Sequence, residues 1–280
     1  MELPSICFIY PYIFISFYII LHIVIFFLII KFIENIQKLA FLWGMINWTV
    51  AIGILYFGPI LFINVNEEEK DSKLKIIKAI ICGIIPPITE DVGRFIVFTF
   101  IYKSKNHNFN NSLIFGAGHG GWESIVLMAL SQINNLGNFY DIKNSKNAEE
   151  LKNKNLLKIY EKYKDGIAID EIFGFIVRFF GNIFHMSASI IAYRLSLNRK
   201  EGKYIIFFTI CFVFHFIIDT IGQLIDLFEL SIWINLFFPG SVIILFAISY
   251  YIWKENKNKD FSDNELKKDK EDPILMESIY

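Results

Sequence analysis

Long uninterrupted apolar stretches constrain the possible folds of this chain more than any other feature. Ile, Phe and Leu dominate several blocks of about 20 residues, the length that a helix needs to cross a hydrocarbon core roughly 30 Å thick. Hydrophobic residues make up 54% of the 280 residues, and the mean hydropathy is +0.45. Because backbone polar groups in lipid must be satisfied within a segment or a closed barrel, the sequence predicts an all-α polytopic membrane helix bundle.

Seven membrane-spanning helices are predicted from these blocks. They cover residues 7–30, 40–64, 76–102, 112–136, 167–194, 204–226 and 229–253. Together they form one expected transmembrane domain over residues 1–253, and the first of them is predicted to be a retained helix rather than a cleaved leader. The loop at 138–166 mixes lysines with acidic residues, which is typical of a short surface helix.

A charged tail is predicted over residues 254–280, where no hydrophobic periodicity continues, and we expect it to be disordered. Lys and Arg are more frequent in the loops on the side of this tail. The positive-inside rule therefore predicts a cytoplasmic tail and an external N-terminus. The net charge is only −1, so no overall positive field favours nucleic acid as a partner.

Ionisable residues interrupt the apolar blocks at several places. On insertion scales each such side chain costs a few kcal/mol at the bilayer centre, so these groups usually pair and face the interior of a bundle. They are Glu90, Asp91, Arg94, His119, Glu123, Arg178, His185, His215 and Asp219.

The spacing of these residues predicts a shared polar site. Residues four apart lie on one helix face, and three such pairs occur: Glu90 with Arg94, His119 with Glu123, and His215 with Asp219. Polar faces on separate helices are how bundles build sites in their cores. We therefore expect these side chains to converge on an interior cavity. For Arg94 and Arg178, structural ion pairing and ligand positioning both remain open.

Three histidines in separate spans suggest a metal site. Zinc at catalytic centres commonly has three protein ligands, with His and Glu among them, and the candidate ligands here are His119, His185 and His215. The HExxH motif is absent, so the sequence permits a zinc ion without specifying one. A serine or cysteine nucleophile is not indicated: Ser124 and Ser187 are expected to be packing residues, and the three cysteines (Cys7, Cys82 and Cys211) to be small core residues.

Glycines and prolines flank two of the polar positions. The stretch "FGAGHGGWESIV" places Gly116, Gly118, Gly120 and Gly121 around His119, at what is expected to be the mouth of an apolar helix. Small residues let membrane helices approach closely, and they would also leave room for a substrate chain. The pair Pro86-Pro87 lacks two backbone donors, so we expect a kink that admits water beside Glu90.

Three motifs give the chain a family resemblance. "EDVGR", "GAGHGGWES" and "HFIID", in this order, resemble the YhfC family of intramembrane proteases, which is grouped with PrsW and with the CAAX-type (CPBP) membrane endopeptidases. "LSQINNL" and "RFFGNIFHMSAS" fit the same family, and the resemblance covers nearly the whole chain. At Asp91 the wider group often has a second glutamate.

The resemblance implies roles for individual residues. Glu90 matches the glutamate that activates water as a general base, with Asp91 and Arg94 as its supporting groups. Glu123 stands at the acidic or histidine position of the second motif. His215 and Asp219 match the third motif, with His215 donating to the oxyanion or binding a metal. His119 and His185 belong to the YhfC-type pattern, and His119 would hold the attacking water or the same ion. A metal-dependent and a purely glutamate-dependent mechanism both remain open.

The implied function is an intramembrane endopeptidase in a bacterial cell membrane. Its substrates would be membrane proteins or lipidated peptides. A transporter coupled to protons or ions is the main alternative, because intramembrane carboxylates and histidines also build proton relays. No inverted repeat is visible, and seven spans do not divide into equal halves. A catalytically silent scaffold that binds membrane partners is the third possibility.

Overall fold

The computed structural model describes residues 2–33, 38–57, 72–101, 109–153, 156–166, 169–197, 204–227 and 237–255. Within these ranges all regular structure is helical and no strand occurs. The protein is therefore an all-α bundle, as predicted. The predicted tail beyond residue 255 lies outside the described residues.

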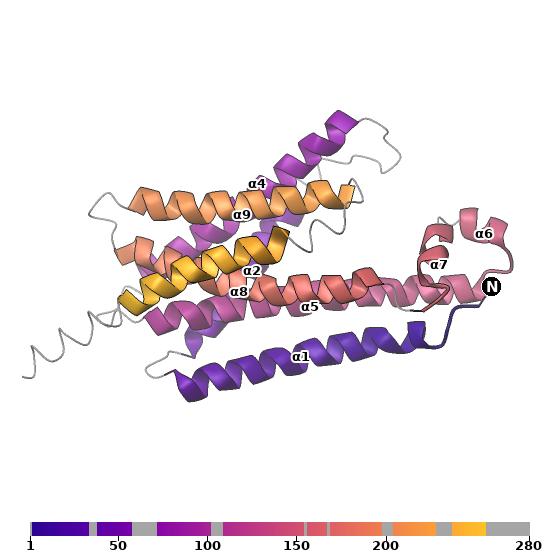
Figure 1. Ribbon diagram of the computed structural model, residues 1–280, viewed down its shortest axis with the longest axis horizontal. Coiled ribbons are helices and arrows are strands. Elements are labelled where there is room, and N and C mark those ends of the chain that lie inside the picture. Colours follow the sequence, from indigo (N-terminus) through magenta and orange to yellow (C-terminus); the bar gives the residue numbers. More distant parts are fainter. Residues whose placement is uncertain are drawn as a thin grey trace, which may run out of the picture.

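Long helices make up the bundle (Figure 1). They are α1 (Ile6–Phe32), α2 (Leu39–Phe57), α4 (Ser72–Ile96), α5 (Phe109–Asn144), α8 (Ile169–Leu197), α9 (Tyr204–Leu227) and a helix over Phe237–Glu255. A π-helical turn, η1 (Val97–Ile101), extends α4. Two short helices, α6 (Ala148–Asn153) and α7 (Leu157–Tyr163), separate α5 from α8.

Helix α5 lies at the centre of the packing. It contacts α1, α2 and α8, while α4 packs mainly against α9 and also against α2 and α8. In Figure 1, α5 and α8 run side by side through the middle, α1 runs below them, and α4 crosses α9 above. The site-bearing helices α4, α5, α8 and α9 are thus neighbours within one bundle.

Each predicted span overlaps one long helix of the described residues. Within the part of the chain that the structure describes, four helices are long and apolar enough to cross a membrane: Ile6–Phe32, Phe109–Asn144, Glu171–Arg194 and Phe237–Glu255. Two shorter apolar helices cover Leu39–Ile54 and Thr209–Leu224. Helix α4 carries lysines near its start and the charged Glu90, Asp91 and Arg94 near its end, and it belongs to neither of these two groups. The exact number of crossings and their orientation stay predictions.

The exposed surface of α1 is typical of a helix that faces lipid. Large apolar side chains such as Ile20, Phe27 and Phe32 are well exposed along it, whereas Tyr18 and His22 point inward and are buried. The helix is apolar around nearly its whole circumference, which suits a hydrocarbon solvent rather than water.

Helix α5 continues eight residues past the predicted end of the fourth span at residue 136, to Asn144. Its last turns are polar in sequence, yet Phe139 and Ile142 are fully buried. Phe139 packs edge-on against Tyr163 of α7. These contacts explain why the helix extends into the region that was expected to be a loop, and α6 and α7 supply the short helices predicted there.

The glycine stretch does not lie at the mouth of a helix. Helix α5 begins at Phe109, seven residues before Gly116, so the stretch is helix interior. Buried Ile114 and Phe115 extend the packed face upstream of the glycines. Pro86 and Pro87 likewise lie inside α4, about one turn before Glu90, and the helix continues through both of them.

Candidate active site

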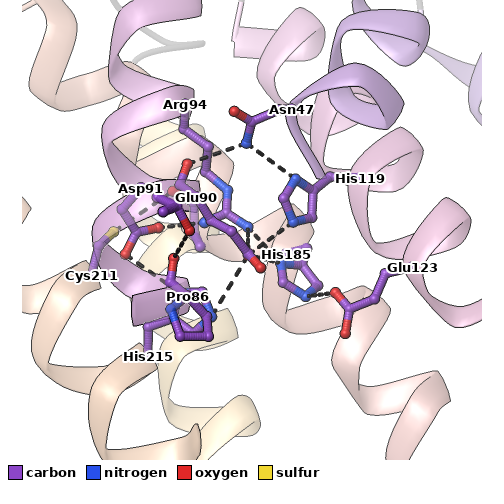
Figure 2. A network of polar contacts seen from close by, with 12 residues as sticks. Asn47, Pro86, Glu90, Asp91, Arg94, His119, Glu123, His185, Cys211 and His215 are labelled. Carbon is purple, nitrogen blue, oxygen red and sulfur yellow. Dashed lines mark hydrogen bonds and ion pairs between the residues drawn. The ribbon is translucent and has the colours of Figure 1, made fainter. Parts of the chain in front are cut away.

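Glu90 of α4 lies at the centre of a buried polar cluster (Figure 2). Its Oε2 is 2.9 Å from Nε2 of His119, 3.7 Å from Nε2 of His215 and 3.8 Å from Nδ1 of His185. These three histidines come from α5, α9 and α8, so four helices meet at one carboxylate oxygen. The Glu90 residue itself is only 7% exposed.

Arg94 is the fully buried cation of the cluster. Its guanidinium forms an ion pair with Asp91 one turn earlier and a second one with Glu90, at 3.2 Å. It also donates a hydrogen bond from Nη2 to Nδ1 of His185, at 2.5 Å. Because a buried charge is tolerated only when it is paired and hydrogen-bonded, these contacts explain how Arg94 can sit inside the bundle with none of its surface exposed.

His185 links the buried centre to a more accessible ion pair. Its Nε2 lies 2.7 Å from Oε2 of Glu123, whose Oε1 accepts a hydrogen bond from Arg178 at 3.0 Å. The side chain of Glu123 is 16% exposed and that of Arg178 37%. The cluster therefore reaches the bundle surface between α5 and α8.

His215 lies between two carboxylates. Its Nδ1 is 3.4 Å from Oδ2 of Asp91, and its Nε2 is 3.4 Å from Oδ2 of Asp219. Asp219 is 29% exposed at its side chain, so the cluster also approaches the surface beside α9. These contacts fix the His215 ring from both nitrogens.

Asn47 of α2 is a member of the cluster that sequence reasoning missed. Its Nδ2 lies 3.2 Å from Nδ1 of His119 and donates to the backbone carbonyl of Glu90, also at 3.2 Å. A single amide inside the apolar run "LWGMINWTV" carries no charge or spacing signal. Asn47 is only 8% exposed, and the packing of the second helix brings it into contact with His119.

Glycines allow the helices that carry these groups to approach each other. A Cβ at Gly116 would collide with the backbone of His185 and Met186, and one at Gly120 with the Cα of Asn182. On the other side of α5, a Cβ at Gly118 would collide with the Phe41 backbone of α2. The part of the glycine prediction that concerned close helix packing therefore matches the structure.

The side chains predicted as catalytic all belong to this one cluster. The structure brings together Glu90, Asp91, Arg94, His119, Glu123, Arg178, His185, His215 and Asp219, and it adds Asn47. One expected pairing differs. His119 turns toward Glu90, whereas Glu123, one turn further along α5, contacts His185 and Arg178 instead.

The group best placed for a metal also differs from the predicted histidine trio. Among the described residues, ligand atoms of Glu90, His119 and His185 lie within 4.8 Å of one another. His215 is not part of this group, although its Nε2 lies 3.7 Å from Oε2 of Glu90.

An apolar groove lies between α2 and α5. It has a volume of about 310 Å³ and is lined from α2 and α5 by Trp48, Thr49, Ile52, Trp122, Val126, Leu127 and Leu130. Trp122 donates its indole N–H to Thr49 across the groove, at 3.1 Å. None of the ionisable residues of the cluster lines it.

Comparisons with known proteins agree with the motif pattern. A family model described as YhfC intramembrane metalloprotease matches residues 17–234. An uncharacterized membrane protein, YhfC, of Bacillus subtilis (strain 168) is 32% identical over 96 residues. That match covers 34% of this chain and 37% of the relative, so it spans little more than a third of either protein. No solved structure matches the chain.

Proposed function

This chain belongs to the YhfC intramembrane metalloprotease family, and on that premise we propose that it hydrolyses peptide bonds in membrane-associated substrates with a water activated by Glu90. The observation that carries the proposal is the position of Glu90, a buried carboxylate surrounded by three histidines and Arg94. The proposed location is the cell membrane of a bacterium, and the proposed substrates are membrane proteins or lipidated peptides.

The proposed reaction assigns a proton acceptor and a donor. Glu90 takes a proton from water as the water oxygen bonds to the scissile carbonyl carbon, and the carbonyl electrons move onto its oxygen. When the tetrahedral intermediate collapses, the C–N bond breaks and Glu90 returns its proton to the leaving amine. The products are a carboxylic acid and an amine, and Glu90 is again ionised.

His215 is the proposed donor to the developing oxyanion. Preorganised donors aimed at this charge are among the largest contributions to catalysis. Asp91 orients the ring through a hydrogen bond to Nδ1 at 3.4 Å, so Nε2, 3.4 Å from Oδ2 of Asp219, is the nitrogen that would donate to the oxyanion. The partly exposed Glu123 and Asp219 lie where the cluster approaches the surface, and they are the proposed points at which water reaches Glu90.

The residues present also fit a metal. Imidazole nitrogen and carboxylate oxygen are usual zinc donors, and a set of three leaves a position for water. Glu90, His119 and His185 would hold the ion. Zinc bound there would supply a Lewis acid that polarises the scissile carbonyl. In this version Glu90 is a ligand, and Glu123, 2.7 Å from His185, is the carboxylate that remains to accept a proton.

The decisive experiment compares Glu90→Gln with Ser187→Ala in the same detergent preparation. Gln keeps the shape of Glu90 but cannot act as a base, so cleavage of membrane peptides should fall by about 10² to 10⁴. Ser187 lies two residues from His185, and its hydroxyl bonds only to the Ile183 carbonyl, at 2.9 Å, among the contacts that the structure shows. Ser187→Ala should therefore cleave normally.

Substrates would be identified by comparing membrane peptides from cells that carry wild type or Glu90→Gln. Peptides that accumulate only in the variant are the expected substrates. A folded Glu90→Gln protein that cleaves at the wild-type rate would refute the role of Glu90 and with it the proposed function.

A further inference from the structure

The amide of Asn47 has one orientation that satisfies both of its neighbours. Its Nδ2 lies 3.2 Å from the backbone carbonyl oxygen of Glu90 and 3.2 Å from Nδ1 of His119. A carbonyl oxygen can only accept a hydrogen bond. If the amide were turned over, its own oxygen would face that carbonyl, and two acceptors would meet in a buried place. The Glu90 carbonyl therefore fixes Nδ2 as the atom between the two partners.

The other side of the amide agrees with this orientation. The Asn47 oxygen lies against Gly93 of α4, where an added Cβ would collide with it and would lie 3.0 Å from Cγ. Gly93 leaves the space that the amide needs, three residues along the helix from Glu90. Asn47 is 8% exposed, so water has little access to replace either of its two hydrogen bonds.

The fixed amide determines where the proton of His119 lies. With an N–H of Asn47 directed at Nδ1, that nitrogen must offer its lone pair, because a proton there would face another proton. The remaining ring nitrogen, Nε2, then carries the hydrogen of the neutral ring. Nε2 is 2.9 Å from Oε2 of Glu90, which is hydrogen-bond distance from an acceptor.

We propose that Asn47 is a positioning residue that keeps Nδ1 of His119 bare and holds its proton on Nε2, as a hydrogen-bond donor to the Glu90 carboxylate. Asn47 acts only through His119 and touches no reacting atom. The proposal rests on the proposed roles of Glu90 and His119, and it specifies which state of the site this chain favours.

This assignment bears on how His119 would bind a metal. Imidazole ligates a metal through a bare nitrogen, and the other ring N–H is usually held by an acceptor. In this chain the nitrogen that faces Glu90 is the protonated one, and the bare one is occupied by a donor. Ligation through Nε2 requires its proton to leave and the Asn47 amide to turn against the Glu90 carbonyl. Asn47 therefore favours the hydrogen-bonded Glu90–His119 pair over metal ligation.

The test reads the proton directly in protein purified without metal. The protein is labelled with ¹⁵N-histidine, and nitrogen NMR distinguishes protonated from bare ring nitrogens. The signals of His119 are those lost in His119→Gln. In the wild type, Nδ1 of His119 should be bare and Nε2 protonated. A wild-type spectrum with a proton on Nδ1 would overturn the proposal, and it requires no variant to fold.

Two substitutions of nearly equal size separate positioning from packing. Asn47→Asp replaces the donor by an acceptor, so a proton should appear on Nδ1. Asn47→Leu has no polar group, so Nδ1 should stay bare and only its hydrogen bond should be lost. Thr49→Val, on the same helix but bonded to Trp122, should leave the His119 signals unchanged. An unprotonated Nδ1 in folded Asn47→Asp would contradict the proposal.

Zinc affinity gives a second readout in the same proteins. With an acceptor at position 47, zinc should bind about 10- to 100-fold more tightly than in the wild type, the usual size of such outer-shell effects. Competition with a coloured chelator measures this change. A gain in zinc affinity in Asn47→Asp without a proton on Nδ1 of His119 would come from the added charge alone. That result would overturn the link between the tautomer and metal binding. Neither of these two measurements involves proteolysis. The cleavage assay with Glu90→Gln tests the proposed function, and the NMR and zinc measurements test the role of Asn47 separately.

Discussion

Glu90 holds His119 from both sides. The carboxylate of Glu90 lies 2.9 Å from Nε2 of the ring, while its backbone carbonyl accepts the amide of Asn47, which in turn contacts Nδ1. The three residues thus form a closed ring of hydrogen bonds between α4, α2 and α5. A displacement of any one of these helices would break at least two of its bonds, so the ring couples the helix arrangement to the geometry of the site.

Asp91→Asn should lower the melting temperature more than Glu90→Gln does. Asp91 is 2% exposed, and its two oxygens contact Arg94 and His215, so Asp91→Asn weakens both contacts. In Glu90→Gln, by contrast, Arg94 keeps Asp91 as its charged partner. Breaking a buried ion pair typically costs about 3–5 kcal/mol. Thermal unfolding of both variants in one detergent measures the difference. Equal destabilisation would show that Arg94 depends on both carboxylates alike.

Metal analysis of single variants should separate the two possible ligand sets. If the purified enzyme contains stoichiometric zinc, His119→Gln, His185→Gln and Glu90→Gln should each lose it, because these three residues offer the grouped ligand atoms. His215→Gln should retain the metal. Loss of zinc in His215→Gln with retention in Glu90→Gln would instead favour the three-histidine site expected from the sequence. Elemental analysis of the purified wild type and of each purified variant distinguishes these outcomes.

Gly44→Ala should destabilise the bundle, and Gly53→Ala should not. Both lie on α2, but a Cβ at Gly44 would collide with the backbone of Phe115 and lie 2.7 Å from the backbone nitrogen of His119, while Gly53 has nothing within 4 Å. Overpacking of this kind typically costs about 1–3 kcal/mol. The pair is compared by thermal unfolding, and Gly44→Ala should also reduce activity because it displaces His119. Identical melting curves would refute the close contact.

Tyr163→Phe should reduce the loss of stability at alkaline pH. Burial, followed by its hydrogen bond to Glu171, raises the pKa of Tyr163 well above its usual range. Because its pKa is higher in the folded than in the unfolded state, Tyr163 contributes stability that is fully present below the unfolded pKa of about 10. This contribution is lost as the pH rises from there toward the folded pKa. Wild type should therefore lose more stability than Tyr163→Phe above pH about 10. Parallel urea titrations at several pH values measure this difference.

The sequence predicted the polar helix faces well, because charge in an apolar run is a strong signal. Glu90 and Arg94 pair as their spacing indicates, and His215 contacts Asp219. Spacing within a helix cannot reveal the partner on another helix. His119 and Glu123 share a face of α5, yet His119 turns to Glu90 of α4, whereas Glu123 turns to His185 of α8, the helix that Gly116 and Gly120 allow to lie close.

Other features lacked any signal in the sequence. Asn47 is one amide in an apolar helix, and only the packing of α2 against α5 makes it a partner of His119. The continuation of α5 to Asn144 was equally hidden, because its polar residues suggest a loop. Phe139 and Ile142 are nevertheless fully buried there, and just upstream Gln132 and Asn135 donate to Glu171 of α8, at 2.8 Å and 3.4 Å.

The balance of formal charges has a consequence for what the cluster can take up. Its carboxylates outnumber its guanidinium groups two to one, since Glu90, Asp91, Glu123 and Asp219 are accompanied by Arg94 and Arg178. A medium of low dielectric constant penalises such an excess of negative charge. Two additional protons on the histidines would bring the cluster to electroneutrality, and so would one divalent cation. Proton uptake and cation uptake therefore compete for the same charge deficit, and ion binding should displace protons into the buffer.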